Sequence, residues 1–266
     1  MNQQDVENFA KEHGNRFHAQ VVSSLRKGGW SVTVSPFYRD IATDKAREAD
    51  VFADKVFPMC SPYDRGKSFP VTLVIECKYL KQEILFWFDK KDADQTKERI
   101  IKDIPELKDN ANIEKHHWFS VPEVAKLFAT VNPNRDERQP ENEIIFSSID
   151  KVLNCLIYYR NTLPRRSTIP PGANSGPRIH YPLIIVDSFS KMFKTTLDYP
   201  ELVEGLDQKI WFPVEVNYAY IGYGQGQRYH NLEYFLVDIV NNTRLAEYLD
   251  LLEKNDIGAV KIMYPQ

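Results

Sequence analysis

The stretch TLVIECKYL, residues 72–80, constrains the fold of this chain more than any other. It opens with a continuous run of apolar and β-branched residues, which is typical of a strand covered on both faces. Glu76, Cys77 and Lys78 follow with no turn residue between them. Alternate residues of a strand share a face, so Glu76 and Lys78 are expected to project side by side, and Cys77 to the opposite face. This strand therefore ends in a carboxylate and an ammonium that point the same way.

Two interpretations of this pair are open. If the strand emerges into solvent, Glu76 and Lys78 form a surface ion pair that contributes about 0–1 kcal/mol. If the strand end is covered, the charges must be paired or bound to a metal, because burying either charge alone is costly.

A second misplaced carboxylate lies upstream, in READVFA, residues 47–53. We expect Asp50 to lie within a short apolar strand, although Asp is depleted in strands. If the two strands pair, Asp50 and Glu76 come within reach of one divalent cation. Hard cations such as Mg²⁺ prefer oxygen ligands, and the cation makes two close carboxylates tolerable.

The rest of the chain alternates helical and extended patterns, which predicts an α/β fold with a central mixed sheet flanked by helices. Gly28-Gly29 is expected to end the first helix, and GYGQGQR to form a hairpin or strand turn. The expected helices cover residues 6–27, 89–102, 121–131, 147–161 and 243–254, the strands cover 30–35, 49–53, 71–78, 181–188, 210–223 and 234–240, and the loops cover 54–70 and 163–178.

Composition limits the protein class. Of the 266 residues, 42% are hydrophobic and 27% charged, as in globular proteins, and no apolar run is long enough to span a membrane. The polar N-terminus is unlike a signal peptide, so we expect a cytoplasmic protein. Three dispersed cysteines indicate no disulfide framework, and His116-His117 is expected to be a solvated or capping pair. A net charge of −3 weakens a nucleic-acid interpretation without excluding it, because local patches decide binding.

The order of helix, strand, Asp-bearing strand, Glu-x-Lys strand and helix resembles the PD-(D/E)XK, or restriction-endonuclease-like, nuclease superfamily. The matching segments are VENFAKEHGNRFHAQVVSSLRKGGWSVTV, READVFA and VTLVIECKYL, so the likeness covers about residues 1–100. The resemblance implies a restriction-endonuclease-like core in a single domain, residues 1–266, whose C-terminal part completes the sheet. It also implies Mg²⁺-dependent cleavage of DNA or RNA, with Mn²⁺ as a substitute.

The resemblance also implies the roles of individual residues. Asp50 and Glu76 would be metal ligands, together with the backbone carbonyl of Cys77. Lys78 would orient or help deprotonate the attacking water, and a lysine beside the scissile phosphate stabilises developing charge.

The chain departs from the superfamily pattern at the first helix. Many relatives carry a glutamate directly after an aromatic residue there, but Phe17 is followed by His18. Glu12 is an alternative ligand or a solvated helix residue. Gln95 matches a helical glutamine of the exonuclease type, or is an exposed side chain.

Contacts with nucleic acid are expected where basic residues meet a Pro/Gly segment. Arg165 and Arg166 suit phosphate contacts, although loops are often charged only because they are wet. Lys90-Lys91 is a weaker candidate. Asp187 and Asp238 follow or end strands, where such residues often cap a helix, and they are left outside the site.

Two functions from different classes follow. The first is a Mg²⁺-dependent nuclease that hydrolyses phosphodiester bonds, with DNA as the expected partner and a homodimer left open. The second is a catalytically silent protein of nuclease fold that binds nucleic acid or another protein, which the missing helix glutamate and the acidic net charge favour. Motifs of other enzyme classes, such as a nucleophile elbow or a Walker loop, are not found in the sequence.

Overall fold

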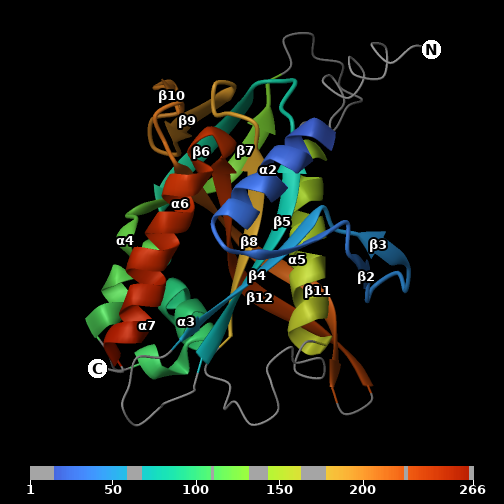
Figure 1. Cartoon of the computed structure of the whole chain (residues 1–266). Helices are drawn as coiled ribbons and strands as arrows, with labels where there is room; N and C mark the ends of the chain where they lie inside the picture. Colours follow the sequence, from blue (N-terminus) through green and yellow to red (C-terminus); the bar gives the residue numbers. More distant parts are fainter. Residues whose placement is uncertain are drawn as a thin grey trace, which may run out of the picture.

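The computed structural model describes residues 15–58, 68–108, 111–131, 143–162, 178–224 and 227–263. These residues form an α/β fold with a ten-stranded mixed sheet flanked by helices (Figure 1). In spatial order the strands are β1 (Ser31–Val34), β4 (Val51–Pro58), β5 (Ser68–Lys78), β8 (Ile179–Val186), β12 (Gln227–Asn241), β11 (Trp211–Gly224), β7 (Glu123–Thr130), β6 (Ile84–Lys90), β9 (Met192–Thr196) and β10 (Glu204–Gly205). A separate hairpin pairs β2 (Phe37–Arg39) with β3 (Ala46–Glu48).

Strand β5 lies inside the sheet, antiparallel to β4 and parallel to β8. All of its residues from Phe69 to Cys77 are buried, as its apolar sequence predicts. Ile75 and Cys77 pack into the hydrophobic cluster on one face, whereas Val74 packs into the cluster on the other. The predicted alternation of side chains along β5 is confirmed.

Helices cover both faces of the sheet. One face packs against α2 (Asn15–Lys27), α3 (Ala93–Asp103), α4 (His117–Ser120), α6 (Leu245–Leu252) and α7 (Gly258–Met263), and the other face packs against α5 (Glu143–Thr162). The described residues contain no helix that is both long and apolar enough to cross a membrane.

The predicted end of the first helix is confirmed. The backbone amides of Gly28 and Trp30 donate to the carbonyls of Ser24 and Leu25 at 3.1 Å, which closes the last turn of α2. Gly29 has a φ of 78°, in the left-handed region where a residue without Cβ is favoured. The part of the predicted helix before residue 15 lies outside the described residues.

Several predicted elements are confirmed with shifted ends. The helix predicted for residues 147–161 is α5, and the helix predicted for residues 89–102 begins only at Ala93, because β6 runs to Lys90 and Asp92 caps α3. The GYGQGQR segment joins β11 and β12, which pair as an antiparallel hairpin with Gly224 opposite Gln227.

Other predicted elements are wrong. Residues 121–131 form strand β7 rather than a helix, because pairing with β6 and β11 overrides the local helix propensity. The loop predicted over residues 54–70 is shorter, since β4 continues to Pro58 and β5 begins at Ser68. Asp50 does not lie within a strand: β3 ends at Glu48 and β4 begins at Val51.

Candidate functional site

The candidate site lies where β4 begins and β5 ends. Val51 pairs with Ile75 in the last pair of the antiparallel ladder, so Asp50 and Glu76 are the residues that lie directly beyond that pair. The backbone amide of Cys77 donates to Asp50 Oδ2 at 2.7 Å. Asp50 therefore bridges the end of the ladder with its side chain, which explains an aspartate directly before an apolar strand.

Glu76 is a buried carboxylate held by two lysines. Its exposed fraction is 1%, and its Oε1 lies 2.7 Å from Lys78 Nζ and 2.9 Å from Lys151 Nζ. The interpretation of Glu76 and Lys78 as a surface ion pair is wrong, since the carboxylate is covered. Two ammonium groups offset the cost of burying one carboxylate.

Lys151 reaches this site from α5, which packs on β5 and β8. Partial burial lowers the pKa of Lys151, but the hydrogen bond and charge of Glu76, together with the charges of Asp50 and Glu48, raise it above its ordinary value. Lys151 is thus a cation within the field of three carboxylates. Sequence reasoning did not find it, because its partner Glu76 is far away along the chain.

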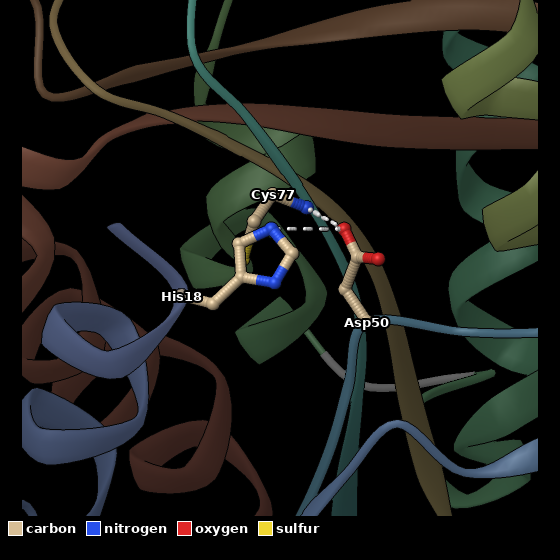
Figure 2. A group of neighbouring side chains, drawn as sticks. All are labelled: His18, Asp50 and Cys77. Atoms are coloured by element: carbon tan, nitrogen blue, oxygen red, sulfur yellow. Dashed lines mark hydrogen bonds and ion pairs between the residues drawn. The ribbon is translucent and has the colours of Figure 1, made fainter. Parts of the chain in front are cut away.

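His18 approaches Asp50 from α2 (Figure 2). Its Nε2 lies 3.7 Å from Asp50 Oδ2, and the ligand atoms of His18, Asp50 and Cys77 all lie within 4.8 Å of one another. The imidazole occupies the position after Phe17, where the resemblance implies a glutamate. A histidine here offers a nitrogen ligand instead of an oxygen.

The thiol of Cys77 belongs to the same group of side chains. Burial raises the pKa of Cys77 well above its ordinary value, and the charges of Asp50 and Glu76 raise it further. At neutral pH the thiol is therefore protonated and unreactive as a nucleophile. The chemistry of the site falls to the carboxylates, the imidazole and the lysines.

Two carboxylate oxygens of the site accept no hydrogen bond found among the described residues. Both lysines contact Glu76 Oε1, and both His18 and the Cys77 amide face Asp50 Oδ2. Within the described part of the chain, no hydrogen bond is found to Asp50 Oδ1 or to Glu76 Oε2. Carboxylate oxygens of this kind fit the oxygen preference of a divalent cation.

The remaining predicted site residues do not join this group. Gln95 donates through Nε2 to Asp92 Oδ2 at 2.8 Å in the first turn of α3. Among the described residues, no hydrogen bond links it to Asp50 or Glu76. Lys91 donates to the backbone carbonyls of Trp118 and Phe119. Glu12, Arg165 and Arg166 lie outside the described residues.

Asp187 and Asp238 do not cap helices. Asp187 Oδ1 accepts a hydrogen bond at 2.8 Å from the amide of Leu80, just past β5. Asp238 is fully buried inside β12, where it accepts from Trp118 Nε1 at 2.8 Å and from the Tyr248 hydroxyl at 2.6 Å. It belongs to a second polar cluster that the sequence did not reveal.

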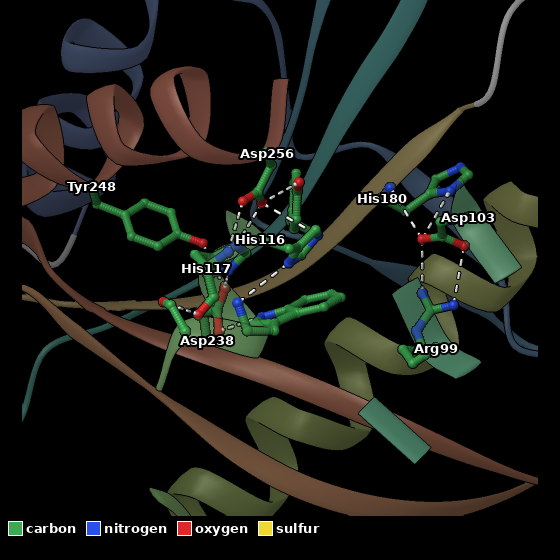
Figure 3. A network of polar contacts seen from close by, with 11 residues as sticks. Arg99, Asp103, His116, His117, His180, Asp238, Tyr248 and Asp256 are labelled. Atoms are coloured by element: carbon green, nitrogen blue, oxygen red, sulfur yellow. Dashed lines mark hydrogen bonds and ion pairs between the residues drawn. The ribbon is translucent and has the colours of Figure 1, made fainter. Parts of the chain in front are cut away.

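This second cluster centres on the His116-His117 pair (Figure 3). His116 Nδ1 accepts from the amide of Trp118, so the capping interpretation is confirmed, but both histidines are buried and the solvated interpretation is wrong. His117 contacts Asp256 Oδ2 at 2.5 Å and Asp238 Oδ2 at 2.9 Å. The cluster ties α4 and the C-terminal helical segment to the sheet.

The charge state of His117 follows from its two carboxylate partners. Burial alone would lower its pKa, but Asp256 and Asp238 outweigh burial and raise the pKa of His117 to about 9. The imidazole is therefore charged at neutral pH and neutralises buried carboxylates. Since both ring nitrogens are engaged and the side chains of His117, Asp238 and Asp256 are fully buried, the cluster is best explained as part of the core.

Comparisons of the chain with protein-family models, with curated proteins and with solved structures found no match.

Proposed function

We propose that this protein is a divalent-metal-dependent nuclease that hydrolyses phosphodiester bonds of nucleic acid, with DNA as the expected substrate. The observation that carries the proposal is that Asp50 accepts a hydrogen bond at 2.7 Å from the backbone amide of Cys77, the residue after Glu76, while the Lys78 ammonium lies 2.7 Å from the Glu76 carboxylate. The motif residues thus lie at the same end of the β4–β5 ladder.

The arrangement of elements gives further support. The chain runs from α2 through edge strand β1 and the β2–β3 hairpin to Asp50, which directly precedes β4. It then continues into β5, which contains Glu76 and Lys78. Apart from the β2–β3 hairpin, this is the order that the resemblance to PD-(D/E)XK nucleases implies as far as β5. The resemblance implies a helix next, whereas strand β6 precedes α3 in this chain. The continuation into a parallel partner, β8, adds the mixed sheet expected of such a core.

The donor set fits a bound Mg²⁺ or Mn²⁺. Asp50 and Glu76 would hold the ion through Oδ1 and Oε2, and the His18 imidazole lies beside Asp50. When bound, such an ion supplies a positive charge that neutralises the scissile phosphate and favours attack by water. The Cys77 backbone carbonyl stays a proposed ligand from the resemblance alone.

The lysines define what the chain contributes to the reaction. The side chain of Lys78 is about a quarter exposed and that of Lys151 nearly half exposed, so both lysines contact the buried Glu76 carboxylate and are also accessible from solvent. An ammonium in this position attracts a phosphate and stabilises negative charge that develops on it. We assign Lys78 to orienting the attacking water and Lys151 to positioning the Glu76 carboxylate.

A cleavage screen tests the proposal. Supercoiled, linear and single-stranded DNA and RNA are incubated with purified protein in the presence of Mg²⁺, Mn²⁺ or a chelator. We expect metal-dependent cleavage of at least one substrate and a loss of about 100-fold or more in Lys78→Ala. Cleavage by Lys78→Ala at the wild-type rate, or no cleavage of any substrate, would overturn the proposal.

One observation favours the second candidate, a catalytically silent nuclease-fold protein that binds nucleic acid. Glu76 is already neutralised by two lysines, so its burial is explained without any metal ion. Titration calorimetry with Mn²⁺ separates the candidates: the nuclease binds the ion and loses binding in Asp50→Asn, whereas the silent protein binds oligonucleotides but not the ion.

A further inference from the structure

A pocket of about 380 Å³ lies between the β2–β3 hairpin, α5 and the paired strands β11 and β12. Its volume is at the lower end of the range of roughly 300–1,000 Å³ that small-molecule sites occupy. Side chains that offer hydrogen bonds, charge or ring surface dominate its lining, among them Asp40, Arg47, Asp150, Asn154, Tyr218 and Asn231.

The pocket adjoins the candidate active site at two places along the chain. On α5, Asp150 lines the pocket, and the next residue, Lys151, contacts Glu76 at 2.9 Å. On β3, Arg47 lines the pocket only three residues before Asp50. A nucleic-acid strand whose phosphate meets the carboxylate pair therefore passes close to the pocket.

The Asp150 carboxylate can accept a further hydrogen bond from a ligand. Its Oδ1 accepts from the Tyr218 hydroxyl at 2.5 Å and from Asn154 Nδ2 at 3.2 Å. Within the described part of the chain, Oδ2 has no partner. A ligand with an N–H donor can satisfy this oxygen, and the hydrogen bonds on Oδ1 hold the carboxylate in a fixed orientation.

Aromatic rings form part of the lining. Tyr218 and Tyr220 lie on the same face of β11, with ring centroids 6.5 Å apart and an interplanar angle of 21°. Both hydroxyls are already used, since Tyr220 donates to Glu233 at 2.7 Å. The rings therefore offer mainly flat apolar surface, which suits a planar aromatic ligand.

The charge of the pocket argues against a phosphate as its ligand. It contains the carboxylates of Asp40 and Asp150, and the Arg47 guanidinium is paired with Asp40 at 3.4 Å. Burial raises the pKa of Asp40, but hydrogen bonds from Thr43, Ala42 and Arg47 hold it below its ordinary value, so this carboxylate is ionised. A neutral ring with amino groups fits this environment, whereas an anion is repelled.

Resting on the proposed nuclease function, we propose that this pocket receives one unstacked base of the substrate strand and favours bases that carry an exocyclic amino group. Adenine, cytosine and guanine carry such an amino group. The N3–H donor of thymine is flanked by two carbonyl oxygens, which a carboxylate acceptor repels. The base is available when the strand is single or when the nucleotide is turned out of a duplex.

The test compares the binding of fluorescent single-stranded ten-residue probes by anisotropy, in a chelator so that no cleavage occurs. The probes are oligo-dA, oligo-dC, oligo-dT and an abasic strand. We expect the wild type to bind the dA and dC probes about fivefold or more tighter than the dT probe, with the abasic probe weakest. Asp150→Asn removes the acceptor charge and is expected to erase this preference.

Two further variants complete the experiment. Ala42→Trp adds bulk at an exposed residue of the pocket wall and is expected to reduce the affinity for every probe to that of the abasic strand. Asp198→Asn, which removes an exposed carboxylate between β9 and β10, is the matched control and should keep the wild-type preference.

The outcomes of this experiment are separable from those of the cleavage screen. Equal binding of all four probes by the wild type, or a preference that survives in both Asp150→Asn and Ala42→Trp, overturns the base pocket even if the protein cleaves. A preference lost in both variants supports the pocket even if no cleavage is seen.

Discussion

At the scale of single residues, the buried charge of Glu76 decides how the site is understood. A carboxylate that is 1% exposed needs partners, and two lysines from different elements supply them. Both lysines lie within 3 Å of the same oxygen, Oε1, and no hydrogen bond to Oε2 is found among the described residues. The same arrangement therefore stabilises the fold and belongs to the cation site that we propose.

Replacing this carboxylate tests its structural part. Glu76→Gln leaves Lys78 and Lys151 facing a neutral amide, and we expect the free energy of unfolding to fall by about 1–3 kcal/mol. Urea denaturation at pH 7 measures it, with Glu201→Gln, an exposed residue, as the control that should stay within about 0.5 kcal/mol of wild type. An unchanged midpoint for Glu76→Gln would show that the ion pairs contribute nothing.

His18 offers a test of metal choice. Imidazole nitrogen suits Mn²⁺ better than Mg²⁺, which prefers oxygen ligands. We expect His18→Ala to weaken Mn²⁺ binding about tenfold or more, and His18→Glu to shift the preference toward Mg²⁺. Calorimetric titration with each ion measures both effects. Identical Mn²⁺ affinities for the wild type and His18→Ala would remove His18 from the ligand set.

The sequence predicted some site residues because their signals are local. Asp50, Glu76 and Lys78 interrupt apolar runs, which can be seen within a few residues. His18 was visible only as a departure from a motif, and its approach to Asp50 depends on how α2 packs. Lys151 gave no signal, because an ordinary helix lysine acquires its partner only when α5 docks on the sheet.

At the scale of secondary-structure elements, Glu233 joins three of them. It lies on β12 and receives both guanidinium nitrogens of Arg160 from α5, at 2.8 and 2.9 Å, and the Lys102 ammonium from α3, at 2.7 Å. Burial raises the pKa of Glu233, but the hydrogen bonds and charge of Arg160, with Lys102 and Tyr220, lower it to about 2.

This lowered pKa sets the direction of an acid effect. The contribution of Glu233 is fully present above its ordinary pKa of 4.5 and is lost as the pH falls toward 2. Glu233→Gln is expected to cost about 3 kcal/mol at pH 7 and much less at pH 2.5. Denaturant unfolding at both pH values measures the difference; an equal cost at both would contradict the ion-pair account.

Elements with a clear apolar pattern in the sequence were predicted correctly, and elements without one were not. Strand β5 and helix α5 carry clear apolar patterns and were found. Strand β7 was taken for a helix, because its sequence EVAKLFAT favours helix locally and its strand state comes from pairing with β6 and β11. The start of α3 was misplaced because β6 extends into the charged run.

At the scale of the whole molecule, buried histidines give opposite pH effects. Burial lowers the pKa of His116 and of His180 to about 4, whereas the carboxylates around His117 raise its pKa to about 9. Stability from the first two is full above pH 6.5 and declines toward pH 4. Stability from His117 is full below pH 6.5 and declines as the pH rises toward 9. These histidines thus place the maximum stability near pH 6.5.

His180 allows a clean test of the acid side of this curve. Neither ring nitrogen has a hydrogen-bond partner among the described residues, and the side chain is almost fully buried. His180→Leu removes the protonation that favours unfolding, so the variant should lose less stability than wild type between pH 6.5 and 4, by about 1–3 kcal/mol. Parallel pH profiles of the urea midpoint would contradict this assignment.

The sheet order itself was beyond sequence reasoning. The α/β class followed from alternating patterns. The direct pairing of β5 with β8, although β6 and β7 lie between them in the sequence, depends on long-range contacts that no local pattern encodes. The buried cluster around His117 was missed for the same reason, since Asp238 and Asp256 lie more than a hundred residues from their partner.

The central claim is that Asp50 and Glu76 hold a divalent ion that cleaves nucleic acid together with Lys78. The most direct measurement is the initial rate of cleavage by the wild type and by Asp50→Asn as Mn²⁺ is titrated, with folding of both confirmed by circular dichroism. We predict a wild-type rate that saturates with Mn²⁺ and a rate at least about 100-fold lower for Asp50→Asn at every concentration. Equal rates for the two proteins, or cleavage that is independent of added metal, would contradict the account.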